Sequence, residues 1–362
     1  MPKMCESKIC PLLASSHNYS PDTLNLSEDS DARLYWFKCF ENLVEKFAVR
    51  AKLSQQNDCT SISRAEAFKK EYIVRLNELK NSKCNPYIPL TVRMLLNLNE
   101  TCLRKHGFTD PWKYQKEIEN KAALKLLENR LKEIDKLDND HKWIELCKGM
   151  LAGNMFDWGA QAVSDILEKE DSFGLQEALS SIQSRPWLID NLDTWLNRLK
   201  NESHNCAVIF VDNSGVDIVL GVLPFARQLL LNNTDVILSA NSEPALNDIT
   251  HNELTTLLKE ASQKCKIIEQ SLECGRLMAI ANGQTGPCLD LKNLNPALTH
   301  AMVENEVDLI IIEGMGRALH TNLYAEFTCE SLKLAVVKNK WLAARLGGDI
   351  FSVIFQYDSS IH

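Results

Sequence analysis

The side chains best suited to catalysis follow apolar runs rich in β-branched residues. Asp212 and Asn213 come directly after the run at 207–211, and Asp248 follows the next run along the chain. Carboxylate and amide oxygens are hard donors that suit Mg²⁺ or Mn²⁺ rather than Zn²⁺. An isolated Asp-Asn pair after a strand more often caps the next helix, by roughly two to one over metal binding. Asp248 can likewise cap a helix near His251.

Other run ends could supply charge or hydrogen bonds to an anion. Asp217, five residues after Asp212, is either a general base or a favourable charge at a helix N-terminus. Gly314 and Gly316 could hold an anion with backbone N–H groups, with Arg317 as a partner. A plain turn from strand to helix is the more common explanation of two such glycines.

Five further residues complete the candidate site. Lys338 ends another apolar run and could bind phosphate, although a lysine there is usually a solvated strand terminus. Ser214 and Asn241 follow two of the runs. Asn154 and Asp157 interrupt two helical stretches, where they either cap a helix or close a cleft from the opposite side. The ends of five apolar runs carry acids, amides, glycines or cations. Together these residues favour one shared site.

The elements that would position these residues form an α/β sheet. Helical patterns, such as those at 216–231, 251–262 and 340–346, separate most of the apolar runs. The runs lie at 206–215, 234–241, 276–283, 307–316, 332–339 and 349–357. This alternation predicts a doubly wound, mostly parallel, Rossmann-like sheet covered on both faces. Ligands bind such sheets beyond the carboxyl ends of the strands, near the switch in strand order.

Upstream of residue 200 the apolar spacing is helical instead. One buried helix face is indicated by Trp36, Phe40, Leu43, Val44 and Phe47, and another by Ala65, Phe68, Tyr72, Leu76 and Leu79. Residues 109–111 predict a helix start, and the helical pattern continues over 113–137. We therefore expect a flexible N-terminal arm at 1–30, a helical domain at 31–200 and an α/β metal-binding catalytic domain at 201–362.

Composition narrows the class of protein. The net charge of −8 disfavours duplex nucleic acid or an anionic membrane as a partner. No run of about 18 apolar residues is present, so no membrane span is predicted. The twelve cysteines have no Cys-x-x-Cys spacing, which favours reduced thiols and a cytoplasmic location. Dinucleotide-binding, P-loop, nucleophile-elbow and Asp-x-Asp phosphatase motifs are absent from the sequence.

Several long motifs resemble those of the metal-dependent damage-control phosphatases, the group built on domain of unknown function 89. The motifs are FVDNSGVDIVLGVLPFARQLL, SANSEPALNDIT, EGMGRALHTNLYAEF, LAVVKNK, LAGNMFDWGAQ and RPWLIDNLDTW. The likeness covers roughly residues 30–357. It is most similar to the 4′-phosphopantetheine phosphatases, a subgroup that includes plant stand-alone members and the C-terminal domain of animal pantothenate kinase 4. We expect a stand-alone phosphatase, because no kinase-like half is present.

The resemblance implies a specific chemistry. Metal ligation by Asp212, Asn213 and Asp248 would recruit a divalent ion, Mg, Mn, Co or Ni. Hydrolysis of 4′-phosphopantetheine, above all its oxidised or damaged forms, would then limit the entry of damaged precursors into coenzyme A synthesis. We expect Asp217 and Lys338 to be catalytic. The expected substrate contacts come from Asn154, Asp157, Ser214, Asn241, Gly314, Gly316 and Arg317.

Competing interpretations remain open at this point. The same metal site could serve a sugar-phosphate phosphatase, although the Arg-Thr-x-Lys motif of that branch is absent. A second alternative is a regulatory domain that binds a small ligand without turnover. A methyltransferase is disfavoured because no glycine-rich nucleotide loop follows the first apolar run. The expected partner is a small phosphorylated metabolite, and the sequence does not predict an oligomeric state.

Overall fold

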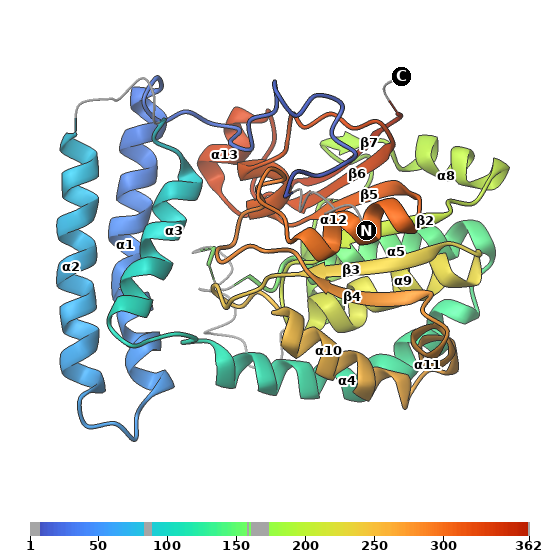
Figure 1. The fold of residues 1–362 in the computed structure, drawn as a ribbon, viewed down its shortest axis with the longest axis horizontal. Helices are drawn as coiled ribbons and strands as arrows, with labels where there is room; N and C mark the ends of the chain where they lie inside the picture. The colour runs from blue at the N-terminus through green and yellow to red at the C-terminus, as the bar shows by residue number, and fades with distance from the viewer. Residues whose placement is uncertain (1–7, 83–88, 158, 161–173, 361–362) are drawn as a thin grey trace, which may run out of the picture.

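A computed structural model describes residues 8–82, 89–157, 159–160 and 174–360. Its centre is a sheet of seven strands in the order β1-β7-β6-β5-β2-β3-β4 (Figure 1). The strands are β1 (Ile189–Asp190), β2 (Cys206–Phe210), β3 (Asp235–Ala240), β4 (Leu277–Ala281), β5 (Val307–Glu313), β6 (Glu330–Val336) and β7 (Val353–Asp358). All pairings are parallel except that of β6 with β7. The predicted fold class, a mostly parallel α/β sheet, is confirmed.

The strand order changes direction at β2. From β2 the chain proceeds outward through β3 and β4, and then returns to place β5 on the other side of β2. Such a switch leaves a crevice beyond the carboxyl ends of the two neighbouring strands. Asp212 follows β2 and Gly314 follows β5, so both lie at that crevice.

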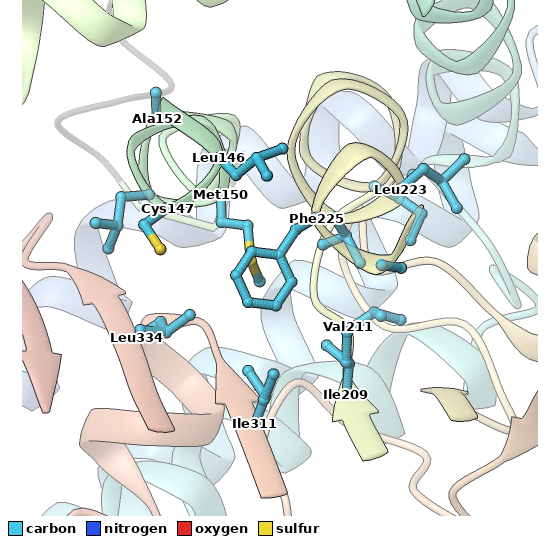
Figure 2. Packing of buried hydrophobic residues seen from close by; sticks show 14 of the residues in the cluster. Leu146, Cys147, Met150, Ala152, Ile209, Val211, Leu223, Phe225, Ile311 and Leu334 are labelled. Carbon is cyan, nitrogen blue, oxygen red and sulfur yellow. The ribbon is translucent and has the colours of Figure 1, made fainter. Parts of the chain in front are cut away.

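Successive side chains of each strand point to opposite faces of the sheet, and both faces are buried. On β2, Ala207 and Ile209 belong to one apolar core, whereas Val208 and Phe210 belong to another. Figure 2 shows the first core, in which α5 and α9 pack over β2, β5 and β6. Because side chains alternate across a strand, burial on both faces requires the nearly continuous apolar runs seen in the sequence.

Most helices flank the sheet. The first core includes residues of α4 (Lys113–Asp135), α5 (Asn139–Gly153), α7 (Leu175–Ser181), α8 (Leu192–Asn201), α9 (Leu223–Leu231), α10 (His251–Ser262), α11 (Lys266–Glu273) and α13 (Lys340–Arg345). The opposite core includes α12 (Pro296–Glu304). Two short π-helices, η1 (Asp217–Val222) and η2 (Met315–His320), follow the loops after β2 and β5. No helix in the described ranges is long and apolar enough to cross a membrane.

Three N-terminal helices stand beside the sheet and have their own core (Figure 1). These are α1 (Ser30–Ser54), α2 (Ser61–Asn81) and α3 (Val92–Lys105), and the predicted apolar stripes of α1 and α2 are buried among them. The later helices α4, α5, α7 and α8 instead share the core of the sheet. The division of the chain near residue 200 therefore remains a prediction, since packing crosses that position.

The N-terminal segment 8–29 is packed rather than loose. Cys10, Leu13 and Tyr19 lie in the core on the α12 side of the sheet, and Leu26 lies among the N-terminal helices. Asp22 forms a 2.6 Å ion pair with Arg93 of α3. Polar composition alone predicted a flexible arm over 1–30, but four buried apolar side chains anchor this part of it. Residues 1–7 of the expected arm lie outside the described residues.

Two local predictions need correction. The helix expected to start at residues 109–111 begins at Lys113, because the Asp110 carboxylate accepts a hydrogen bond from Trp112 N and holds a turn before the helix. The expected α-helix over 216–231 opens instead as η1. The short strand β1 had no recognisable pattern in sequence, since two residues cannot show a period.

Candidate active site

A cavity of about 310 Å³ opens beyond the carboxyl ends of β2 and β5. Its polar side is lined by Asp157, Asp212, Asn213, Asp248 and Lys338. Its other side is formed largely by apolar residues of α1 and α3. The sheet edge and the N-terminal helices therefore enclose the space between them, which is where the sequence places its strand-end residues.

Arg317 joins the two predicted metal-binding carboxylates. Its Nη1 pairs with Asp212 Oδ1, and its Nη2 lies 2.8 Å from Asp248 Oδ2. The same Nη2 donates to Asn241 Oδ1 at 3.1 Å, and Asn241 Nδ2 donates to Asp248 Oδ2 at 3.0 Å. Arg317 is fully buried, so its charge is balanced by these carboxylates rather than by water.

Backbone contacts fix the spacing of the two acidic segments. Asn213 and Asp248 form an isolated antiparallel bridge, and Ile249 N donates to Asp212 O at 3.0 Å. The carbonyl of Asp248 also accepts a 3.5 Å hydrogen bond from Lys116, a buried lysine of α4. Two loops that are 35 residues apart in sequence are thus held side by side by main-chain bonds.

Asn154, directly after α5, and Lys338, two residues after β6, lie on another side of the site. Asn154 ends α5, and its Nδ2 donates to Asp212 Oδ2 at 2.9 Å. Lys338 Nζ donates to the Asn154 carbonyl at 2.6 Å and forms a 2.8 Å ion pair with Asp157. Of this group, Asp157, Asp212 and Lys338 line the cavity, and Asn154 lies behind them. Asn154 and Asp157, which the sequence placed between two helical stretches, therefore lie at the edge of the sheet.

Asp217 lies beneath the cavity and holds Asn213. Its Oδ2 accepts hydrogen bonds from Asn213 N at 3.1 Å and from Asn213 Nδ2 at 2.8 Å. Burial raises the pKa of Asp217, and burial followed by the Asp217 carboxyl raises the pKa of Glu313 well above its usual range. Both side chains are fully enclosed. This position suits Asp217 for orienting Asn213, and its role as a general base stays a prediction.

The glycine turn after β5 makes room for Asp212. Gly314 has φ +100°, and a methyl group built on it would lie 2.3 Å from Asp212 Oδ2. The backbone N–H of Gly314 donates to Leu334 O, and that of Ser214 donates to Asn247 O. Both N–H groups are therefore already bonded to the main chain, so an anion at this turn would have to be bound by other groups than the Gly314 N–H. Gly316 lines the cavity, against the Pro287 carbonyl.

Burial also sets the charges around the cavity. It raises the pKa of the Asp248 carboxyl well above its usual range, with Asp157 and Glu100 adding to the effect. It lowers the pKa of Arg317 to about 9, which leaves this guanidinium protonated at neutral pH. It lowers the pKa of His320 to about 4, so this imidazole is neutral.

The donor set fits a hard divalent cation. Asp212 and Asp248 contact the same guanidinium, and Asn213 is bridged to Asp248, so two carboxylates and an amide lie together at one cavity. Among the described residues, no three His, Cys, Asp or Glu side chains gather in a metal-binding group. A metal here would therefore depend on Asn213 and on oxygen atoms from solvent or substrate, as Mg²⁺ commonly does.

A family model for the damage-control phosphatase ARMT1-like domain matches residues 37–353. The chain belongs to this family. A damage-control phosphatase of Arabidopsis thaliana is 36% identical, over 89% of this chain and 87% of that protein. A domain of unknown function 89 family protein from Pyrococcus horikoshii has the same fold, with a TM-score of 0.60 at 17% identity, covering 88% of this chain and 97% of that one.

Longer relatives match nearly the whole chain. A mouse 4′-phosphopantetheine phosphatase is 42% identical over 96% of this chain and 48% of its own length. A pantothenate kinase 2 of Arabidopsis thaliana is 35% identical over 97% of this chain and 42% of its own length. The chain thus spans less than half the length of these two relatives.

Two residues at this site were given no role by the sequence interpretation. Glu313 ends β5, and its acid type at a strand end was a usable signal, but only the structure brings it close enough to Asp217 for that carboxyl to raise its pKa. His320 lines the cavity three residues after Arg317. The π-helical turn η2 that places His320 at the site has no recognisable sequence pattern.

Proposed function

We propose that this chain is a divalent-metal-dependent phosphatase that hydrolyses 4′-phosphopantetheine, including its oxidised or otherwise damaged forms, to pantetheine and phosphate. The observation that carries the proposal is the meeting of Asp212, Asp248, Lys338 and Arg317 beside a cavity with an apolar wall. Family membership supports phosphatase chemistry, and the 42% identical mouse relative supports the substrate. A sugar phosphate offers nothing apolar to pack against that wall.

Asp212, Asn213 and Asp248 would hold the metal. Bound there, a divalent ion supplies Lewis-acid polarisation of the phosphoryl group and orientation of the attacking water. Arg317 pairs with both carboxylates and fixes their positions, and Asp217 orients the Asn213 amide through a hydrogen bond. These buried residues therefore act by positioning. The divalent ions that such oxygen donors are expected to hold here are Mg, Mn, Co and Ni.

Lys338 and Asp157 would act on the substrate directly, since both line the cavity. The Lys338 ammonium neutralises charge on the phosphoryl oxygens as the bond to the pantetheine oxygen breaks. Asp157 lies 2.8 Å from that ammonium and is the cavity carboxylate without a contact to Arg317 among the described residues. It is therefore placed to take the proton of the attacking water.

Phosphate release tests the proposal. The purified chain, first treated with chelator and dialysed, is assayed with 4′-phosphopantetheine, its sulfonate and fructose 1-phosphate, with and without each of the four metals. We expect turnover that requires metal and a much higher kcat/KM for the two pantetheine compounds. Full turnover in excess chelator would show that the reaction does not need a metal. A preference for the sugar phosphate would show that the substrate is a sugar phosphate.

We also propose a cytoplasmic location. All ten cysteines among the described residues are free thiols, as expected in a reducing compartment. Fractionation of cells that express the chain, with antibody detection, tests this proposal.

A further inference from the structure

The wall of the cavity opposite the carboxylates is apolar and comes from separate elements. It is lined by Trp36, Phe40 and Leu43 of α1, Val92 and Leu96 of α3, and Leu246. A cavity of about 310 Å³ exceeds what a phosphate group occupies, since it corresponds to roughly ten water volumes. The space beyond the carboxylates therefore suits an uncharged extension of the substrate.

One polar side chain lies on the boundary between the apolar and charged sides. His320 lines the cavity and is only 7% exposed, yet its ring nitrogens form no hydrogen bond with any residue that the structure describes. The Trp36 ring meets the imidazole edge-on, with 4.9 Å between centroids and an interplanar angle of 87°. Thr23 N donates to the His320 carbonyl at 3.0 Å, which fixes its backbone.

His320 lines the cavity, so a ligand bound there can replace water at its ring nitrogens. The imidazole is neutral because burial lowers its pKa to about 4, so one nitrogen can donate and the other can accept. It therefore matches an amide or hydroxyl group, and it adds no charge to compete with Lys338 for the phosphate.

We propose that His320 and the apolar wall of α1 and α3 form the binding site for the uncharged arm of the substrate, with His320 hydrogen-bonding an amide or hydroxyl of that arm. This inference rests on the proposed function, which places the phosphate at Asp212 and Lys338. His320 is a specificity-determining residue here, and it takes no part in breaking the phosphate ester bond. Binding energy collected along the arm orients the phosphoryl group at the carboxylates.

The test compares two substrates that differ in the arm alone. 4′-Phosphopantetheine carries the dimethyl carbon, the hydroxyl and two amides, whereas neopentyl phosphate ends after the branched carbon. His320→Phe keeps the ring that packs on Trp36 and removes the hydrogen bond, and His320→Gln retains a hydrogen-bonding group. The matched control is His300→Gln, at a 41% exposed histidine on α12.

We expect His320→Phe to raise KM for 4′-phosphopantetheine by about three- to tenfold, the usual effect of one uncharged hydrogen bond. Its kinetic constants for neopentyl phosphate and its inhibition by inorganic phosphate should stay unchanged. His320→Gln should recover part of the loss, and His300→Gln should match the wild type. Equal losses on both substrates would overturn the inference, because His320 would then serve the phosphate site or the scaffold.

The wall itself is tested by a second pair of variants. Leu96→Asn places a polar group on the cavity wall, whereas Leu34→Asn makes the same change at a 64% exposed position of α1. Only Leu96→Asn should lower the preference for 4′-phosphopantetheine over neopentyl phosphate. If the wild type prefers 4′-phosphopantetheine but His320→Phe and Leu96→Asn both keep that preference, the arm site is wrong and the proposed function stands. If the wild type shows no preference, the arm site is wrong, and the assays with chelator and fructose 1-phosphate decide the proposed function.

Discussion

At the scale of single residues, the main question is how the negative charges of Asp212 and Asp248 are compensated. Two buried carboxylates that line the same cavity repel each other, and burial raises the pKa of Asp248 well above its usual range. Arg317 relieves this by pairing with both, and Asn154 and Asn213 add amide hydrogen bonds to Asp212. A divalent cation would use the same oxygens, so Arg317 is expected to tune metal affinity.

Asp212→Asn should reduce kcat/KM by about 10² to 10³-fold, because it removes a charge at the point where the phosphoryl group is stabilised. The fold should persist, since Arg317 keeps its partners Asp248 and Asn241. Calorimetric metal titration, phosphate release and thermal melting measure the three effects. Asp235→Asn, at the start of β3, is the control. Loss of the cooperative melt in Asp212→Asn would show that Asp212 is structural.

The buried imidazole of His320 should make stability fall in acid. Its folded pKa is about 4, and the unfolded value is near 6.5, so between these values the unfolded chain binds more protons. Lowering the pH from 8 to 5 therefore costs about 2 kcal/mol through this residue. Asp157 and Lys338 act on it in opposite directions.

His320→Phe cannot titrate, so its melting temperature should fall less than that of the wild type between pH 8 and pH 5. Differential scanning fluorimetry at both pH values measures the change. His300→Gln should follow the wild type, because that ring is partly exposed. Parallel acid dependence in His320→Phe and the wild type would contradict the assignment of a buried neutral ring.

At the scale of elements, the ends of β2 and β5 create the site through irregular backbone. Both strands lead into π-helices, η1 and η2, whose wider turns are frequent at functional sites. Asp217 begins η1, and Arg317 and His320 belong to η2. An ordinary α-helical turn would rotate these side chains to different directions, so the element type decides which residues meet.

Gly314→Ala tests the turn after β5. A methyl group there meets the Asp212 carboxylate and must also adopt φ +100°, so we expect at least about a hundredfold loss of activity, comparable to loss of a charge-stabilising group. The control is Gly275→Ala, which has φ +78° but nothing within 4 Å of the added methyl. It should cost about 1 kcal/mol of stability and no activity. Equal activity in both variants would show that catalysis does not depend on the position that Gly314 gives to Asp212.

At the scale of the whole molecule, three remote parts of the chain meet at one site. The sheet supplies the carboxylates, α1 and α3 supply the apolar wall, and the N-terminal segment supports the loop after η2. Tyr19 donates to Asn322 Oδ1 at 2.6 Å, and Asn322 Nδ2 donates to the Arg317 carbonyl at 2.9 Å. The polar start of the chain thus reaches the site through a buried tyrosine.

Tyr19→Phe should lower the free energy of unfolding by about 1–3 kcal/mol, because it leaves Asn322 Oδ1 and Leu291 N without their partner. Urea denaturation measures this change, and activity should fall only a few-fold. Tyr324→Phe, at a 77% exposed tyrosine, is the control and should have no effect. A Tyr19 variant as stable as the control would show that the N-terminal segment does not support this loop.

The sequence by itself determined the sheet and the residues at its edge. Continuous apolar runs such as 206–211 can be buried only in a sheet covered on both faces, so the fold class and the strand ends follow from local pattern. Because parallel strands end at a common edge, Asp212, Asp248, Arg317 and Lys338 could be grouped before any contact was known.

Only the tertiary structure decided what each of these residues does. Whether Asp217 faces the cavity or lies beneath it depends on the π-helical turn, and that turn has no signature in local sequence. The bridging of Asp212 and Asp248 by Arg317, the pairing of Glu313 with Asp217 and the burial of Tyr19 join residues tens to hundreds of positions apart. Local propensity cannot encode such contacts, because they arise from the packing of whole elements.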